Sequence, residues 1–390
     1  MYNFNKIIDR KNTDSLKYDC AKKYGFPPDV IPLWVADMDF QTPPQVVKAL
    51  KKCARHAIFG YSEPDDAYYA TVQNWFLKRF AFKSQREWIV KTAGIVFSLA
   101  ASIKAFTKPG DAVLIQTPVY HPFHSLITMN KRKLVKNSLI NSNGAYSIDF
   151  DDFEKKIVEN KVKLFLLCSP HNPVGRVWTK QELKKMADIC LKRGVLVMSD
   201  EIHCDFIYKG FKHTVFANLG EKHLKNCAIF TAPSKTFNLA GLQASNVFIA
   251  DEILRNKFKT ELEKTGYEQL NVMGLTACRA AYKYGHSWVR ELNAYLEKNL
   301  DYIKKYLKAN IPQIKLTDPQ GTYLIWLDFN ALGLGQNGLR RLTVDKAGLW
   351  LSNGKIFGAE GRGFFRMNIA CPLRTIKTAL ERLKTAIDAK

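Results

Sequence analysis

Short apolar runs alternate with segments of helical pattern along the first two thirds of this 390-residue chain. Two of these runs, residues 164–168 and 195–199, are apolar almost throughout instead of alternating with polar residues. Such runs are typical of strands that are buried on both faces, as in parallel sheets. Strands that are separated by helices predict βαβ units. We therefore expect an α/β fold with a mostly parallel central sheet.

The spacing of apolar residues also predicts where the individual elements lie. Helices are expected at residues 43–57, 66–82, 95–107, 180–193 and 251–264, and a last helix is expected to begin at 373. Strands are expected at residues 88–91, 112–116, 164–168, 195–199, 228–232, 245–249, 323–328 and 364–369.

The pattern changes near residue 288. Apolar residues recur at helical spacing from position 289 to position 307, which predicts one long helix. The strands and the helix that follow it form a smaller α+β unit. Because a chain of this length exceeds one simple core, two domains are expected. We predict a large domain at 42–287 and a small domain made of 1–41 and 288–390.

Polar side chains follow three of the expected strands. Asn172 follows the strand at 164–168, Asp200 follows 195–199, and Lys235 comes after a run that ends near 232. Open α/β sheets bind their ligands at the carboxyl ends of strands. Small and apolar residues surround Lys235, and in such a dry place a lysine can lose its proton and form a Schiff base with an aldehyde. Pyridoxal phosphate (PLP) is such an aldehyde, and its ring withdraws electrons.

These motifs carry a resemblance that runs nearly end to end. The chain resembles the fold-type-I PLP enzymes of the aminotransferase class I/II superfamily and, within it, the cystathionine β-lyase-like (MalY/PatB) C–S lyases. The matching segments are residues 34–40, 59–61, 93–96, 117–120, 169–175, 200–203, 234–236 and 366–370. Of these, 34–40 and 200–203 point to the lyases rather than to aminotransferases at large.

The resemblance implies roles for the residues around the cofactor ring. Lys235 holds the aldehyde and later takes the substrate Cα proton, while Asp200 is the ionised partner of the ring nitrogen. Tyr120 is expected to stack on the ring, and Asn172 to donate to its phenolic oxygen. His203 stands where many aminotransferases have a tyrosine, so it either bonds the cofactor edge or is a core histidine.

The resemblance also implies where the cofactor phosphate and the substrate bind. The cofactor phosphate is expected at the start of a helix, formed by Gly94, Ile95 and Val96. The Ser234 side chain is expected to bind it too, and so is Tyr61 from the second chain of a homodimer. Many aminotransferases add an arginine where this chain has Gln243. The substrate carboxylate is expected at Arg366, with Arg362 as the fallback and with Val35, Ala36 and Asn172 close to it.

The implied reaction is α,β-elimination from sulfur amino acids: L-cystathionine would give homocysteine, pyruvate and ammonia, in methionine biosynthesis, and cysteine or S-conjugates are further substrates. A PLP-dependent aminotransferase is the alternative, because it shares the cofactor and the first steps. An alternative of another class is a regulatory or interaction protein that uses the same fold. Its support is the net charge of +23.

The composition argues against several other classes of protein. The lysines are spread along the chain and form no known nucleic-acid motif, so nucleic-acid binding is not expected. The eight cysteines lack Cys-x-x-Cys spacing, which predicts reduced thiols and no metal site. No apolar stretch is long enough to span a bilayer. Charged residues at 9–11 interrupt any signal peptide, and we expect a cytoplasmic enzyme.

Overall fold

The computed structural model describes residues 2–267 and 269–389 of the chain. The strands are β1 Ile31–Pro32, β2 Ile89–Thr92, β3 Ala112–Thr117, β4 Lys133–Ser138, β5 Ile140–Ser142, β6 Ala145–Ser147, β7 Leu164–Cys168, β8 Leu196–Asp200, β9 Cys227–Thr231, β10 Ser245–Phe248, β11 Lys315–Leu316, β12 Leu324–Asp328, β13 Leu349–Trp350, β14 Ser352–Asn353 and β15 Phe364–Asn368. The helices are α1 Pro44–His56, α2 Asp66–Phe80, α3 Ile95–Phe106, α4 Pro122–Met129, α5 Phe150–Glu159, α6 Lys180–Lys192, α7 Glu221–Leu224, α8 Pro233–Thr236, α9 Glu252–Glu263, α10 Val272–Tyr284, α11 His286–Asn310, α12 Gln336–Arg340 and α13 Leu373–Asp388.

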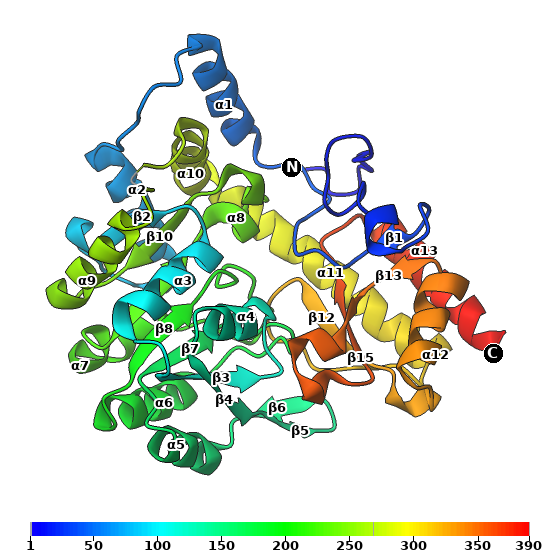
Figure 1. Ribbon diagram of the computed structural model, residues 1–390. Helices are drawn as coiled ribbons and strands as arrows, with labels where there is room; N and C mark the ends of the chain where they lie inside the picture. The colour runs from blue at the N-terminus through cyan, green and yellow to red at the C-terminus, as the bar shows by residue number, and fades with distance from the viewer. Residues whose placement is uncertain (1, 268, 390) are drawn as a thin grey trace.

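A seven-stranded sheet lies at the centre of the larger part of the molecule (Figure 1). Its strand order is β2-β10-β9-β8-β7-β3-β4, and β10 alone among these seven runs antiparallel to its neighbours. The inner strands β3, β7 and β9 are buried along their whole length. The mostly parallel α/β sheet predicted from the continuous apolar runs is therefore confirmed.

Helices cover both faces of this sheet because successive residues of a strand point to opposite sides. In β3, Val113 and Ile115 belong to a core shared with α3, α4 and α9. Leu114, between them, belongs to the other core, to which α2, α6 and α10 contribute. The result is a three-layer arrangement, and the carboxyl ends of the parallel strands meet at one edge of the sheet.

The C-terminal third forms a smaller unit around a second sheet. Its order is β11-β12-β15-β14, and each neighbouring pair is antiparallel. The 25-residue helix α11 runs diagonally between the two parts in Figure 1. The N-terminal segment joins this unit because β1 pairs with β13. The domain limits at 41/42 and 287/288 stay a prediction.

Most predicted elements recur within one or two residues of their expected limits. Sequence analysis did not predict the helices α4, α5 and α10. Within 2–267 and 269–389, no helix combines the length and the apolar character that crossing a bilayer requires. Among the same residues, no three or more His, Cys, Asp or Glu side chains come together as a metal site.

Candidate active site

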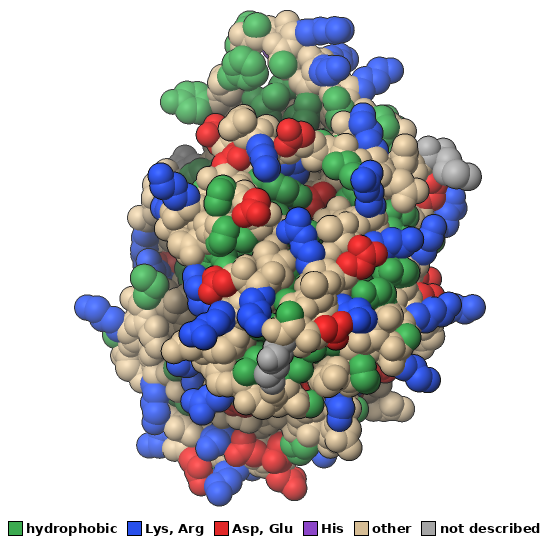
Figure 2. Space-filling view, turned by 90° about the vertical axis from the view of Figure 1, so that its right-hand side faces the viewer, with side chains coloured by type: hydrophobic (Ala, Val, Ile, Leu, Met, Phe, Trp, Pro, Cys, Tyr) green, Lys and Arg blue, Asp and Glu red, His purple; other side chains and the backbone are tan. Residues whose placement is uncertain are grey.

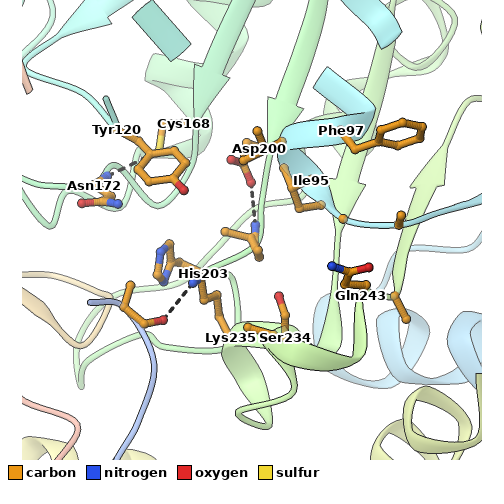
Figure 3. Close-up of a pocket in the computed structure, with 17 residues that line it drawn as sticks. Ile95, Phe97, Tyr120, Cys168, Asn172, Asp200, His203, Ser234, Lys235 and Gln243 are labelled. Atoms are coloured by element: carbon orange, nitrogen blue, oxygen red, sulfur yellow. Dashed lines mark hydrogen bonds between the residues drawn. The ribbon is translucent and has the colours of Figure 1, made fainter. Parts of the chain in front are cut away.

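A pocket of about 380 Å³ opens at the carboxyl edge of the large sheet (Figure 3). It brings together ten of the residues predicted for the site: Ala36, Gly94, Ile95, Val96, Tyr120, Asn172, Asp200, His203, Ser234 and Lys235. It is also lined by residues that sequence analysis did not assign to a site: Ala93, Phe97, Cys168, Ile202, Ala240, Gln243 and Ala244. Segments that are far apart in sequence therefore meet around one cavity.

Asp200 is the last residue of β8, so its side chain emerges at the sheet edge. It lies beside Cys168, its partner in the β7–β8 register, and its Oδ1 accepts a hydrogen bond of 3.1 Å from the Ile202 amide. Burial raises the pKa of Asp200 to about 7, and the Ile202 bond and the Lys235 charge oppose this rise only in part. A cation at this position in the pocket would restore the carboxylate.

Lys235 lies in the short helix α8, and its amine points into the pocket (Figure 3). The Nζ atom donates a hydrogen bond of 2.8 Å to the Ala36 carbonyl oxygen. Burial lowers the pKa of Lys235 to about 8; Asp37 and Asp200 favour the charged amine, and Arg366 disfavours it. The neutral amine that a nucleophile or a base needs is therefore far more populated near neutral pH than in an ordinary lysine, and it reaches half of the molecules near pH 8.

Arg366 lies in β15 of the smaller unit and borders the pocket through Asn172. Its side chain is buried, and its NH1 donates to Asn172 Oδ1 at 3.1 Å. Its NH2 donates to the Trp34 carbonyl at 2.8 Å and to Ser352 Oγ at 3.2 Å. Arg362, by contrast, is exposed. The buried guanidinium lies next to Asn172, which itself lines the pocket.

Tyr120 and His203 form further walls of the pocket. Tyr120 is close to Asp200, and burial raises the pKa of its hydroxyl. His203 Nδ1 is buried and has no hydrogen-bond partner among the described residues. Burial, with the Lys235 and Arg366 charges, holds the pKa of His203 far below its usual value. His203 is therefore a neutral ring, and one of its polar atoms is without a protein partner.

The start of α3 forms the other end of the pocket. Gly94 precedes the helix with φ 141°, a conformation that favours glycine. Amides in the first turn of a helix have no partner within the helix, so those of Ile95 and Val96 are available to an anion. Ser234 and Gln243 line the same pocket. The predicted phosphate residues thus meet here, except Tyr61.

Besides Arg366, which lies behind Asn172, two predicted residues do not line the pocket. Tyr61 is 99% exposed and lies on a different surface of this chain. Val35 precedes Ala36, which lines the pocket, and its own carbonyl accepts a bond of 2.5 Å from Asn368 Nδ2. Asn368 Nδ2 also donates to the Asp37 carbonyl at 2.6 Å.

Residues 34–39 form a backbone wall of the site, which we call the 34–39 segment. The Ala36 carbonyl accepts bonds from two side chains, Lys235 and Tyr323, the latter at 2.9 Å. Asn238 binds both the amide and the carbonyl of Met38, each at 2.9 Å. Sequence analysis missed Tyr323, Asn238 and Asn368 because backbone acceptors leave no motif; the positive φ of Asn238, in a turn directly after the lysine, is a weak signal.

The pocket's donor set fits PLP. Free helix amides and the Ser234 hydroxyl suit its phosphate, the Asp200 carboxyl suits a protonated ring nitrogen, and the Lys235 amine suits its aldehyde. The Tyr120 ring supplies an aromatic surface beside them. The unpartnered His203 nitrogen is one more polar atom that such a ligand would meet.

Comparison with known proteins agrees with this geometry. The family model of aminotransferase class I and II matches residues 28–383. The chain belongs to the aminotransferase class I and II family. Within the family, it is 42% identical to cystathionine β-lyase PatB of Bacillus subtilis (strain 168), over 99% of this chain and 100% of PatB. It is 32% identical to the protein MalY of Escherichia coli (strain K12), over the full length of both chains.

A solved structure from the same family extends the likeness to three dimensions. The crystal structure of cystalysin from Treponema denticola, which contains a pyridoxal 5′-phosphate cofactor, superposes with a TM-score of 0.97. It is 40% identical to this chain and covers all of both chains. The predicted resemblance to cystathionine β-lyase-like C–S lyases and the predicted fold-type-I architecture are therefore confirmed.

Proposed function

We propose that this member of the aminotransferase class I and II family is a PLP-dependent C–S lyase that eliminates a thiol from sulfur amino acids. The observation that carries the cofactor chemistry is the Lys235 amine in the pocket, whose pKa is lowered and which interacts with Asp200 and the buried Arg366. The likeness to PatB and to cystalysin supports it. L-cystathionine is the proposed substrate, and homocysteine, pyruvate and ammonia are the products.

Arg366 binds the substrate carboxylate in this proposal. Its guanidinium is buried and already oriented by Trp34 and Ser352, so little side-chain entropy is lost when a carboxylate binds. Asn172 holds NH1 and stands between Arg366 and the pocket. A carboxylate that meets this pair fixes the amino-acid backbone, which leaves the Cα–H bond to be oriented toward Lys235.

Lys235 moves the proton. Its neutral amine takes the proton from the substrate Cα, and the Ala36 carbonyl holds the nitrogen in place through the 2.8 Å bond. Asp200 is oriented by the Ile202 amide, and its carboxylate would keep the ring nitrogen of PLP protonated. Bound PLP supplies the electron sink that makes the Cα proton acidic and lets a Cβ thiolate depart.

The proposed assembly is a homodimer in which Tyr61 reaches the phosphate end of the second copy's pocket. Helix α1 and the loop after it project from the body of the chain (Figure 1). Exposed apolar side chains gather there: Ile58 is 68% exposed and Phe59 61%. Such a patch is typical of a protein–protein interface. Because this chain has Gln243 where many aminotransferases have an arginine, the phosphate end of the pocket needs another hydrogen-bond donor. The Tyr61 hydroxyl of the second copy would provide it.

The test is a simple assay with the purified, PLP-loaded enzyme. With L-cystathionine alone we expect steady release of pyruvate and homocysteine in equal amounts. An aminotransferase would instead need an added 2-oxo acid and would release no thiol. Amino-group transfer without thiol release would contradict the proposal. A role in methionine biosynthesis belongs to the same proposal and is supported by the homocysteine product. Cytoplasmic location is proposed with it.

A regulatory or nucleic-acid-binding protein is not favoured by any surface feature that we find. Figure 2 shows Lys and Arg side chains scattered over the visible face, with Asp and Glu between them. A nucleic-acid site instead gathers basic residues in one stripe or patch. The face shown in Figure 2 therefore gives the charge of +23 no support as a nucleic-acid site.

A further inference from the structure

A buried cluster of charges lies behind the 34–39 segment, outside the pocket. It consists of Arg10 and Lys17 from the N-terminal segment together with Asp37 and Asp39. Arg10 grips Asp37 with two bonds, NH2 to Oδ2 at 2.6 Å and NH1 to Oδ1 at 3.2 Å. Such a two-bond arginine–carboxylate pair is both strong and directional. The cluster contains two positive and two negative side chains, so its formal charge is balanced.

The rest of the cluster anchors Asp39. Lys17 is fully buried, and its Nζ donates to Asp39 Oδ2 at 2.9 Å. The Tyr18 hydroxyl donates to the same oxygen at 3.0 Å, and Arg10 NH1 donates to Oδ1 at 2.8 Å. Asp39 therefore has three donors. Asp37 depends mainly on Arg10, because Lys17 Nζ is 3.6 Å from its Oδ1.

The cluster is connected to the reactive amine through one peptide unit. Asp37 follows Ala36, whose carbonyl binds Lys235 Nζ at 2.8 Å. The Val35 and Asp37 carbonyls on either side are both held by Asn368, so the 34–39 segment cannot turn away from the lysine. The distance between the Asp37 carboxylate and the Lys235 amine is therefore fixed. The ion pair with Arg10 determines how much of the Asp37 charge is neutralised.

We propose that Arg10 is a positioning residue that, by pairing with Asp37, sets how readily the Lys235 amine gives up its proton. With Arg10 in place, the Asp37 charge is partly compensated, so it holds less of the amine in the ammonium form. Without Arg10, the unpaired carboxylate would favour the ammonium form. The inference rests on the proposed function only in taking Lys235 as the reactive amine.

Other charged groups also face this pair. Asp200, Arg366 and His203 interact with Lys235 from the other sides of the pocket, and Tyr323 interacts with Asp37. These groups are the same in each variant described below. The exposed fraction of the side chains, 22% for Arg10 and 19% for Asp37, means that water weakens the effect.

The experiment is a titration of Lys235 in the full chain after removal of PLP. The protein is treated briefly with an acylating reagent at a series of pH values, and the peptide that contains Lys235 is quantified by mass spectrometry. We expect a wild-type midpoint near 8. Arg10→Gln should raise the midpoint by about half a unit to one unit, and Asp37→Asn should lower it by a similar amount.

Two control variants separate charge from shape. Arg10→Lys keeps the charge but loses the second bond, and its midpoint should stay near the wild-type value. Arg193→Gln removes an arginine that is also bonded twice to a carboxylate, Glu154, at 3.0 and 2.7 Å, and it should have no effect. If Arg10→Gln does not fold, Asp37→Asn still gives a shift of predicted sign.

The PLP-loaded enzyme provides a second readout. The acid limb of the pH profile of kcat, which reports groups of the enzyme–substrate complex, should move in the same direction as the midpoint for each variant. Midpoints that shift in one direction for both Arg10→Gln and Asp37→Asn, or that do not shift, would contradict the inference. The titration needs no substrate, so a failed lyase assay with shifted midpoints would overturn the proposed function and leave this inference standing.

Discussion

The pocket has two unlike walls. On one side, Asn172, Asp200 and Lys235 follow strands of the large sheet and present side chains to the cavity. On the other side, the 34–39 segment presents mainly backbone carbonyls, those of Trp34 and Ala36, to Arg366 and Lys235. The first wall supplies reactive groups, while the second fixes their positions.

The two walls also differ in what stabilises them. The strand-end wall is part of a sheet whose backbone bonds hold it regardless of the side chains at its edge. The 34–39 segment has little such support: β1 pairs with β13 just before it, and the Asp39 amide donates a bond of 2.9 Å to the Ala370 carbonyl. It is held by amide side chains and by the buried charges around Asp39. Substitutions on the first wall should therefore change chemistry, and those behind the second should change stability and alignment.

The largest effect is expected for Lys235→Ala, which removes the reactive amine from the strand-end wall. We expect kcat for pyruvate release to fall at least about a thousand-fold, since a general base contributes about 10²–10⁴-fold and the attachment of the cofactor is lost as well. Borohydride reduction of the PLP-loaded enzyme should label the Lys235 peptide only in the wild type. The exposed Lys222→Ala is the control. Activity close to wild type in Lys235→Ala would refute the assigned role.

The next largest effect is expected for Lys17→Met, behind the second wall. Lys17 is fully buried against Asp39, so its loss leaves a buried carboxylate with less compensation. We expect the free energy of unfolding to fall by about 3 kcal/mol, as measured in urea. Adding Asp39→Asn should recover part of this loss, and a double-mutant cycle gives the coupling. Purely additive losses would show that the pair contributes nothing specific.

The difference between the two pocket walls explains which site residues could be predicted from the sequence. Asp200 and Asn172 were found because polar residues that follow apolar strand runs are visible in the chain itself. Ala36 was proposed only through the resemblance, because the acceptor is a carbonyl that every residue has. Tyr323, which binds that carbonyl, is 287 positions away, and only the folded chain brings them together.

The secondary structure shows the same limit of sequence-based prediction. The continuous runs of β7 and β8 predicted strands correctly. Helix α10 was missed because its buried stripe consists of small residues, Gly274, Ala277, Cys278 and Ala281, which give only a weak apolar signal at helical spacing. The resemblance placed Tyr61 near a second copy's phosphate, and a single chain does not test that placement.

A moderate effect is expected for Arg366→Lys, where the two walls meet. Lysine keeps the charge but loses the planar fork that bonds Asn172 and the Trp34 carbonyl at once. We expect kcat/KM for L-cystathionine to fall about 100-fold, or about 2–3 kcal/mol, mostly through KM. Arg362→Lys changes an exposed arginine and should behave as wild type. If Arg362→Lys lowers kcat/KM and Arg366→Lys does not, the substrate carboxylate binds Arg362 instead.

The smallest effect is expected in the pH dependence of stability of the protein without PLP. The pKa of Lys235 is lowered to about 8 in the folded protein, against an ordinary value of 10.5 in the unfolded chain. The unfolded state therefore binds more protons between these values, and the Lys235 contribution to stability rises with pH through this window. Below pH 8 the buried ammonium costs stability, so Lys235→Met should be more stable than the wild type there, by about 1–3 kcal/mol. The difference should shrink between pH 8 and 10 in urea unfolding. If the stability difference between Lys235→Met and the wild type does not change with pH, the pKa of Lys235 is the same in the folded and unfolded chain. The strand-end wall would then lack the neutral amine that distinguishes it from the 34–39 segment.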